Sequence, residues 1–519
     1  MRVRIFFLLF CTFLAGLPAW ADPKCEALNH LNLPGIAIKS AMPVAAGLFS
    51  LPNRPGSPQV SVPAFCRVVG TVLPELNFEL WMPAQWNHKY VAVGNGGLAG
   101  NLSYNGMVNP LERGYAAAST DTGHIGDGRD GSWALGHLGR VLNFGQNGVH
   151  LMAVANKAIL HAYYGSAPVH SFFNGCSYGG KQALTEVQRY PKDFDGVIAG
   201  DPANWWTRHY SASHIWIAQA MEGDGYIPPT KVPILADAVN KACDALDGIK
   251  DGVLTDPRRC HFDPASIQCR SGDGAFCLTA AQVQTVRKIW SGPHDALGQT
   301  LYPGLEPGGE AGPGGWAEWV TGKAPGQGGH SALGLPVMRY MVFENPEWDL
   351  RSFHYESASG LENDLEFTQD KLSSIFDAVS PDLRSFRANG GKLIQYHGWS
   401  DPDIPPMNSI NYYESVVRGE SRSAGHESLH DTREFYRLFM VPGMQHCAGG
   451  PGPSRFDMLG ALDQWVEQGK APDHIVAAHA TNGVVDRTRP LCAYPEEAHY
   501  KGSGSTDDAV NFVCMVPGN

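Results

Sequence analysis

The sequence predicts an α/β fold, in which helices cover both faces of a parallel sheet and a large domain is inserted into it. Strand-like and helix-like segments alternate in the N-terminal and C-terminal parts of the chain, a pattern typical of a covered parallel sheet. Between these parts the alternation stops, and helix-like stretches, clustered cysteines and a Gly/Pro-rich segment replace it. We therefore expect a signal peptide at 1–21, a core formed by 22–203 and 382–519, and an inserted domain at 204–381.

Length and composition exclude several classes of protein. The 519 residues suffice for one large domain or two, and 43% hydrophobic residues with 13 tryptophans exclude a disordered chain. A net charge of −12 without a basic run argues against nucleic acid as a partner. Beyond the N-terminal segment no apolar run is long enough to span a bilayer, so we expect no membrane partner.

The N-terminus has the three parts of a secretion signal. A charged start at 1–4 precedes an apolar run at 5–17, and Ala19-Trp20-Ala21 is a cleavage site. We therefore expect a mature chain that begins at Asp22 and is secreted or periplasmic. Because Cys11 lies in the signal, ten of the 11 cysteines remain, and an even number in an exported chain predicts disulfides.

The elements of the core are read from short apolar runs and the turns between them. A strand-rich region at 25–86 comes first, and the β-branched run at 89–93 then predicts a buried strand ending in the turn Gly94-Asn95-Gly96-Gly97. We expect strands at 68–72, 77–82, 89–93, 114–121, 169–173, 194–200, 392–396, 434–441 and 474–479, and core helices at 149–164 and 456–468.

The segment 174–180, Asn-Gly-Cys-Ser-Tyr-Gly-Gly, contains the pattern G-x-S-x-G around Ser177. A strand is expected before it and a helix directly after it. Flanking glycines permit a tight turn that exposes the serine hydroxyl at its apex, next to the positive end of the helix. The pattern alone is weak, because glycine and serine are common in turns. Its strand–helix context makes Ser177 the candidate nucleophile.

A nucleophilic serine needs a base that takes its proton and a carboxylate that orients the base. In α/β-hydrolases the acid and then the histidine follow the serine, on loops after later strands. The strand at 392–396 leads into His-Gly-Trp-Ser-Asp-Pro-Asp, and the strand at 434–441 leads into Pro-Gly-Met-Gln-His. We therefore predict Asp401 as the acid and His446 as the base, with Asp403 as the competitor for Asp401.

Cysteines flank two of these residues, since Cys176 precedes the serine and Cys447 follows the histidine. A disulfide requires Cα atoms about 5.5–6 Å apart, so a bridge between the two would fix the base against the nucleophile. The combination resembles the tannase and feruloyl esterase family, which includes the mono(2-hydroxyethyl) terephthalate hydrolases. Its signature is a Cys-Ser pair, an aspartate and a His-Cys pair with bridged cysteines, which Cys176-Ser177, Asp401 and His446-Cys447 match.

The resemblance covers nearly the whole mature chain and includes the segments 341–349 and 397–401. It implies hydrolysis of aromatic-acid esters through an acyl-enzyme, and the expected fold is an α/β-hydrolase fold with a large inserted lid domain. It also implies an oxyanion hole from the backbone N–H of Tyr178 and one from the glycine-rich turn, for which we choose Gly97. The expected disulfides are Cys176–Cys447, Cys25–Cys66, Cys243–Cys260, Cys269–Cys277 and Cys492–Cys514.

An acidic loop at 243–253 brings three aspartates together in the insertion. Carboxylates this close repel one another unless a cation neutralises them, and Ca²⁺ prefers about six to eight oxygen ligands. The loop is not an EF-hand, because the glutamate at its twelfth position is missing, and a solvated acidic turn is the alternative. The family has a structural Ca²⁺ at this motif, and the resemblance implies as ligands the side chains of Asp244, Asp247 and Asp251 and the carbonyls of Ile249 and Val253.

We therefore expect an exported serine carboxylesterase whose substrate is a small aromatic ester or one derived from a plant polymer, of the feruloyl type. A galloyl ester, as for a tannase, or mono(2-hydroxyethyl) terephthalate is the alternative substrate. A calcium-stabilised, non-catalytic binding module is the alternative from another class, and an intact serine, acid and histidine in order argue against it. The candidates for an aromatic wall are Trp205, Trp206, Phe343 and Trp348, although packing in the core of the lid is the stronger expectation for most of them.

Overall fold

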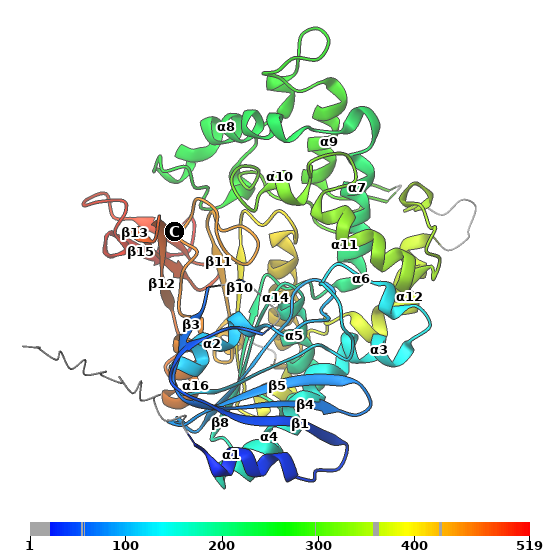
Figure 1. Cartoon of the computed structure of the whole chain (residues 1–519). Helices are drawn as coiled ribbons and strands as arrows, with labels where there is room; N and C mark the ends of the chain where they lie inside the picture. The colour runs from blue at the N-terminus through cyan, green and yellow to red at the C-terminus, as the bar shows by residue number, and fades with distance from the viewer. Residues whose placement is uncertain are drawn as a thin grey trace, which may run out of the picture.

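The computed structural model describes residues 21–52, 56, 58–295, 297–355, 363–424 and 428–518. Apart from Ala21, the predicted signal peptide lies outside these residues. Figure 1 shows a central sheet with helices on both sides and a mostly helical segment over one end of it. No helix in the described part of the chain has both the length and the apolar character that crossing a membrane requires.

The central sheet has nine strands in the order β1-β4-β5-β7-β6-β8-β9-β10-β11. Its parallel part consists of β6 (Lys89–Val93), β7 (Ala116–Thr120), β8 (His170–Cys176), β9 (Gly196–Gly200), β10 (Lys392–Gly398) and β11 (Tyr436–Val441). The remaining strands, β1 (Ile36–Val44), β4 (Phe65–Val72) and β5 (Leu76–Pro83), are antiparallel to their neighbours. The sheet is therefore mixed, because the short turn between β4 and β5 permits only an antiparallel pair.

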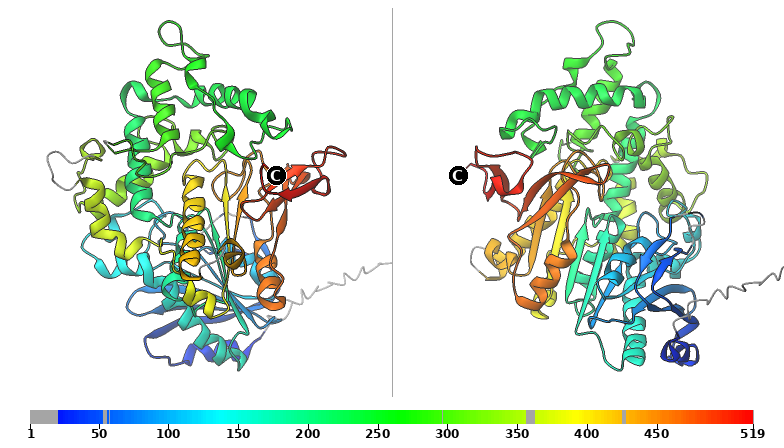
Figure 2. Two further views of the ribbon diagram at one scale, coloured as in Figure 1. Left: turned by 180° about the vertical axis from the view of Figure 1, so that it is seen from behind. Right: turned by 60° about the vertical axis from the view of Figure 1, so that its left-hand side comes forward.

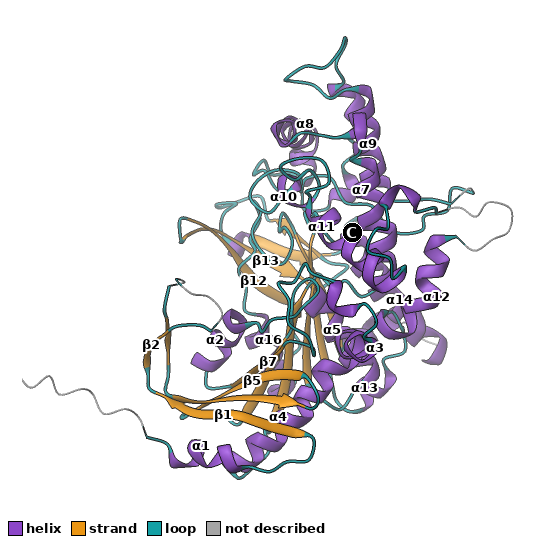
Figure 3. Ribbon diagram, turned by 45° about the vertical axis from the view of Figure 1, so that its right-hand side comes forward, coloured by secondary structure: helices purple, strands orange, loops and turns teal. Residues whose placement is uncertain are grey.

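Side chains of each central strand alternate between two apolar cores. Tyr90 and Ala92 of β6 belong to one core, and Val91 and Val93 belong to the other. The first core is covered by α1 (Pro23–Ala27), α4 (Gly148–Tyr164), α5 (Tyr178–Arg189), α13 (Arg384–Ala388), α14 (Pro406–Ala424) and α15 (Ser428–Arg433). The second is covered by α2 (Tyr104–Glu112) and α16 (Met458–Gln468), on the opposite side of the sheet (Figure 3).

The chain between β9 and α13 lies over the carboxyl ends of the parallel strands (Figure 2). Its helices are α6 (Trp206–Arg208), α7 (Trp216–Ala220), α8 (Val232–Cys243), α9 (Ala280–Ser291), α10 (Trp316–Trp319), α11 (Gly329–Val337) and α12 (Asp364–Phe376), with π-helical η4 (His209–Ile215) and η10 (Met338–Val342). One apolar cluster joins this segment to the core: Trp206 stacks on Phe376, and both lie against Phe144. Phe144 in turn stacks on Tyr178 at the start of α5, so the segment packs directly above the serine turn.

The C-terminal strands form ribbons of their own. β12 (His474–Thr481) pairs with β13 (Val484–Cys492), and β14 (Glu497–Tyr500) pairs with β15 (Phe512–Met515). The strand expected at 474–479 therefore exists but does not extend the central sheet. The reason is local: Asn482-Gly483, with φ of 51° and 83°, forms a two-residue turn that folds β12 back onto β13. The other short elements are α3 (Leu138–Leu142) and the pair β2 (Gly47–Phe49) and β3 (Val60–Val62).

Five disulfides join cysteines of the described residues, and they are the five expected pairs. Four lie away from the serine turn: Cys25–Cys66, Cys243–Cys260, Cys269–Cys277 and Cys492–Cys514. The first ties α1 to β4 within the core, and the next two stay within the segment between β9 and β10. The fifth, Cys176–Cys447, belongs to the site itself.

Candidate active site

Ser177 occupies a strained turn between β8 and α5. Its φ of 65° and ψ of −122° lie outside the regions that non-glycine residues prefer, and such strain is characteristic of functional sites. The turn is tied to the neighbouring strand β9, because the backbone N–H of Ser177 donates to the carbonyl of Gly200 over 3.0 Å. The hydroxyl is thereby presented at the carboxyl edge of the sheet, beside the N-terminus of a 12-residue helix.

The glycines around Ser177 are required by close backbone contacts. A Cβ atom on Gly175 would lie 2.4 Å from the carbonyl oxygen of Gly179, and one on Gly180 would lie 2.2 Å from that of Gly200. Both oxygens belong to regular elements, because Gly179 lies in α5 and Gly200 ends β9, the strand that pairs with β8. The pattern G-x-S-x-G-G thus has a steric cause in this chain.

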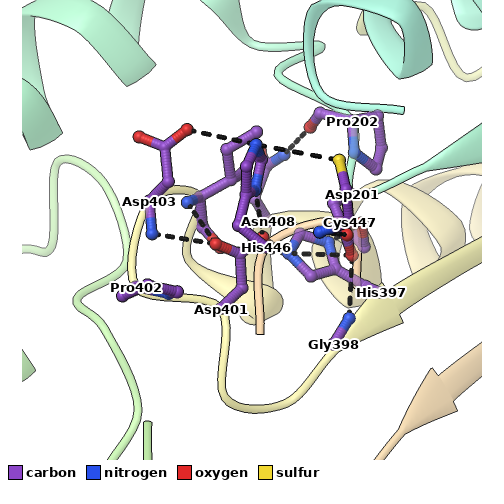
Figure 4. Close-up of polar contacts among 12 residues, drawn as sticks. Asp201, Pro202, His397, Gly398, Asp401, Pro402, Asp403, Asn408, His446 and Cys447 are labelled. Carbon is purple, nitrogen blue, oxygen red and sulfur yellow. Dashed lines mark hydrogen bonds and ion pairs between the residues drawn. The ribbon is translucent and has the colours of Figure 1, made fainter. Parts of the chain in front are cut away.

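The loops after β10 and β11 bring the predicted acid and base together (Figure 4). His446 Nδ1 lies 2.9 Å from Asp401 Oδ2, and Asp401 Oδ1 accepts the backbone N–H groups of Asp403 at 2.8 Å and Ile404 at 3.0 Å. Burial would raise the pKa of Asp401, but His446 and His397 outweigh it and lower the pKa to about 2. Asp401 is therefore an anion that fixes the orientation of the histidine ring.

Asp403, the competing carboxylate, lies at the opposite edge of the same ring. Its Oδ2 is 3.5 Å from His446 Nε2, and its Oδ1 is 2.9 Å from His214 Nε2. Burial would lower the pKa of His446, but Asp401 and Asp403 outweigh it and raise the pKa to about 10. The two aspartates therefore hold different nitrogens of one histidine.

Ser177 and His446 line the same cavity, yet no hydrogen bond joins the serine hydroxyl to the imidazole among the described residues. Bonds between a nucleophile and its base are often long in the absence of substrate. In the structure, Nε2 of His446 faces Asp403 and forms no hydrogen bond with the Ser177 hydroxyl.

A disulfide and a buried carboxylate hold the three loops together. Cys176 and Cys447 are bonded with a Cα–Cα distance of 5.9 Å, which links the serine turn to the histidine loop. Asp201, at the end of β9, accepts the backbone N–H of Cys447 at 2.6 Å and that of Gly398 at 2.8 Å (Figure 4). Burial raises the pKa of Asp201 to about 6, against the opposing charge of His397. Sequence reasoning missed Asp201, and its position directly after a buried strand was the available signal.

The cavity above Ser177 has a volume of about 720 Å³ and a mixed polar and apolar lining. Trp319 of α10 forms part of its wall and meets the His446 ring edge to face, with centroids 5.0 Å apart. Sequence reasoning missed Trp319, because nothing in its neighbourhood distinguishes it from core tryptophans. The four aromatic residues considered from the sequence, Trp205, Trp206, Phe343 and Trp348, do not line the cavity and pack within the segment between β9 and β10.

Of the two expected oxyanion donors, one follows the serine in the chain and the other lines the cavity. Tyr178 is the first residue of α5, and Gly97 lines the cavity with a φ of 54°. A Cβ on Gly97 would lie 2.3 Å from the carbonyl oxygen of Gly128, so the loop requires glycine there. The roles of both N–H groups stay predictions.

The acidic loop follows α8 and carries hard oxygen donors. Asp244 Oδ1 accepts the N–H of Gly252 at 2.8 Å, and Asp247 Oδ2 accepts the hydroxyl of Thr255 at 2.6 Å. Asp251 Oδ2 pairs with Arg489 of β13 at 2.9 Å. Burial, and to a lesser extent the charge of Asp251, raises the pKa of Asp247. Carboxylate and carbonyl oxygens are the donors that a hard cation such as Ca²⁺ prefers. In the described part of the chain, however, the three carboxylates are not among the groups whose ligand atoms lie within 4.8 Å of one another, and Asp251 already pairs with Arg487 and Arg489.

A buried group of two histidines and an aspartate lies beside the histidine base. His209 and His214 belong to η4, whose hydrogen bonds join residues five apart, and side-chain nitrogen or oxygen atoms of these two residues and Asp403 lie within 4.8 Å of one another. All three side chains are buried. Asp403 contacts both His214 and His446, so this group of residues is connected directly to the active site.

Comparison with known proteins places the chain among esterases. The family model described as tannase and feruloyl esterase matches residues 60–515. An uncharacterized esterase of Xanthomonas campestris pv. campestris is 41% identical over 96% of this chain and 92% of the relative. The mono(2-hydroxyethyl) terephthalate hydrolase of Piscinibacter sakaiensis is 31% identical over 96% of this chain and 93% of the relative. The crystal structure of feruloyl esterase B from Aspergillus oryzae superposes with a TM-score of 0.84 at 27% identity, covering 95% of this chain and 99% of that one.

Proposed function

The chain belongs to the tannase and feruloyl esterase family and is a carboxylic ester hydrolase, and from that premise we propose that it is a serine esterase for esters of hydroxycinnamic-type acids. One observation carries this proposal. A serine in a strained strand–helix turn opens into the same cavity as a histidine whose Nδ1 is held by a buried aspartate. This is the arrangement that acyl transfer through a serine ester requires.

The proposed reaction follows from these contacts. His446 Nε2 takes the proton of the Ser177 hydroxyl as Oγ bonds to the acyl carbon and the carbonyl π electrons move to oxygen. The N–H groups of Tyr178 and Gly97 stabilise that oxyanion. When the carbon–alcohol bond breaks, His446 returns the proton to the leaving oxygen and an acyl-enzyme remains. Water then repeats the sequence, releasing the acid and restoring the serine.

The cavity supports an aromatic acid as the acyl group. Tyr104, Trp319 and Leu333 give it apolar surface, and its volume of about 720 Å³ lies in the range typical of small-ligand sites. The carboxyl ends of the parallel strands supply the polar groups on the opposite wall. We propose that the segment 204–381 is a lid domain that determines specificity, since α10 and α11 contribute part of the wall.

A substrate panel tests the specificity. We expect kcat/KM for methyl ferulate to exceed that for methyl gallate and for mono(2-hydroxyethyl) terephthalate, as measured by chromatography of the released acids at equal enzyme concentration. A preference of about tenfold or more for either alternative would replace the feruloyl assignment. Absence of turnover on all three, together with no labelling by a fluorophosphonate probe, would instead favour the non-catalytic binding module.

The disulfides support an exported protein. Five bridges are stable only where thiols are not continuously reduced, such as the periplasm or the extracellular space. We propose that the chain acts in one of these compartments after removal of residues 1–21.

We propose that the acidic loop binds Ca²⁺ through Asp244, Asp247 and Asp251 with the carbonyls of Ile249 and Val253. The ion would neutralise the carboxylates and hold the loop together, while Asp251 also contacts Arg489 of the C-terminal ribbon. Its role is structural, because these residues are absent from the lining of the cavity.

Chelation is therefore expected to lower thermal stability more than activity. EGTA should lower the melting temperature by several degrees, because an ion that binds only the folded state stabilises it by mass action. Turnover well below the melting transition should change less than about twofold. Asp244→Asn should lower the melting temperature similarly and make it insensitive to EGTA. Immediate loss of turnover that Ca²⁺ reverses, without a change in melting, would indicate a catalytic ion instead.

A further inference from the structure

Asp403 is a buried carboxylate with few sources of compensating charge. It is 2% exposed, and its oxygens contact His214 Nε2 at 2.9 Å and His446 Nε2 at 3.5 Å. His214 comes from η4 and His446 from the loop after β11, so the segment above the sheet and the core meet at this carboxylate. An ionised carboxylate this deep in a protein requires a cation or several hydrogen bonds.

The neighbouring groups leave one partner able to supply that charge. His209 and His330, which also surround the carboxylate, have their pKa values lowered by burial, that of His330 to about 3, so both are neutral at physiological pH. His214 donates one hydrogen bond through Nε2, and a second proton on its buried Nδ1 would have no acceptor, which disfavours the charged ring. Tyr210 lies against His214 with a raised pKa and stays neutral. The cation available to Asp403 is therefore the imidazolium of His446.

The groups facing His446 lead to the same conclusion. Asp401 holds the N–H at Nδ1, Asp201 and His397 lie behind Asp401, and Trp319 and Cys447 are uncharged. A neutral His446 with its proton on Nδ1 would direct the lone pair of Nε2 at the carboxylate of Asp403, which is repulsive. A protonated ring would donate from both nitrogens, one to each aspartate, and satisfy all three groups.

We infer that Asp403, anchored by His214, is a positioning residue that holds His446 as an imidazolium between two carboxylates, so that hydrolysis starts only after the Nε2 proton is lost to solvent. This inference rests on the proposed serine mechanism and deepens it. The ring would become a base only at alkaline pH, because each carboxylate stabilises its charged form. The same contact would stabilise the imidazolium that forms when the ring accepts the serine proton.

The anchoring of Asp403 depends on a local irregularity of the chain. η4 is a π-helix, and π-helical turns are frequent at functional sites. Its wider turn brings His209 and His214 together, with ring centroids 4.3 Å apart, and directs His214 at Asp403. His330 completes the support by donating from Nε2 to the carbonyl of Pro402 at 2.9 Å. The carboxylate is thus fixed from the segment above the sheet and from its own loop.

The test is the pH dependence of kcat/KM for methyl ferulate and of Ser177 inactivation by a fluorophosphonate, from pH 6 to pH 10. In the wild-type chain we expect both rates to rise with pH, with the midpoint of the acidic limb above about pH 8, against about 6.5 for an unperturbed histidine. In Asp403→Asn, which retains the shape and an acceptor for His214, the midpoint should fall by about one pH unit or more. Its plateau at high pH should stay within about tenfold of wild type.

Asp473→Asn is the matched control, because it removes an exposed carboxylate that pairs with Arg437 and should leave the midpoint unchanged. An identical midpoint in wild type and Asp403→Asn would overturn the inference. If circular dichroism shows that Asp403→Asn does not fold, the test is the midpoint of the acidic limb of the wild-type pH profile. A midpoint near pH 6.5 overturns the inference, and a midpoint above pH 8 supports it. Absence of labelling at every pH would instead overturn the serine mechanism, and the inference with it.

Discussion

Ser177→Ala is expected to abolish hydrolysis while leaving the fold intact. Removing the nucleophile of a serine hydrolase costs about 10⁶-fold in kcat, because no hydroxyl is left for the histidine to deprotonate and no acyl-enzyme can form. The fold should not change, since the serine hydroxyl has no hydrogen-bond partner among the described residues, while the backbone bond from Ser177 to Gly200 is retained. The strained backbone at this position should cost alanine about as much as it costs serine, because both residues carry a Cβ atom.

The measurement is kcat on methyl ferulate at the plateau of the pH profile, with labelling by a fluorophosphonate and the melting temperature recorded in parallel. Ser415→Ala is the control: it removes a hydroxyl that donates only to the carbonyl of Tyr412 in α14, so both activity and labelling should persist. Residual activity of Ser177→Ala within about tenfold of wild type would show that another residue is the nucleophile.

Features encoded in short segments were predictable from the sequence. The strand, the turn with Ser177 and the helix lie within 20 consecutive residues, and the steric demands of Gly175 and Gly180 leave a readable pattern. The positions of Asp401 and His446 follow from topology, since the loops after parallel strands meet at the same edge of the sheet. The α/β-hydrolase fold and the family are confirmed by the comparisons.

Features created by packing between distant segments were not predictable. The contact of Asp403 with His214 joins residues 189 positions apart and depends on a π-helix, for which the sequence shows no signal. Trp319 reaches His446 only because α10 lies over the sheet. The pairing of β1 with β4 likewise joins strands that are separated by β2 and β3. By contrast, the pairs β4–β5 and β12–β13 follow from short turns and could have been derived from the sequence.

Asp401→Asn is expected to lower kcat by about 10⁴-fold, the loss typical of a triad histidine held in the wrong tautomer. The hydrogen bonds of the loop give the physical reason. Asp401 Oδ1 accepts the N–H groups of Asp403 and Ile404, which an amide nitrogen cannot do. The carbonyl of the new asparagine would therefore take that position, and its NH₂ group would face His446 Nδ1. That nitrogen would then have to accept, so the ring proton would move to Nε2 and the base would be lost.

Asp403→Asn provides the matched comparison, because it removes a carboxylate from the same loop and the same ring. It should lower kcat by less than about tenfold at the plateau of its own pH profile, since Nδ1 keeps its proton and Nε2 stays an acceptor, which the NH₂ group of the asparagine would face. Both variants should be compared on methyl ferulate at the same number of pH units above the midpoint of their own acidic limb. Protonation of His446 then does not mask the effect of the tautomer. A larger loss in Asp403→Asn than in Asp401→Asn would reverse the assignment, because the aspartate that sets the tautomer must bind the nitrogen opposite to the one that takes the serine proton.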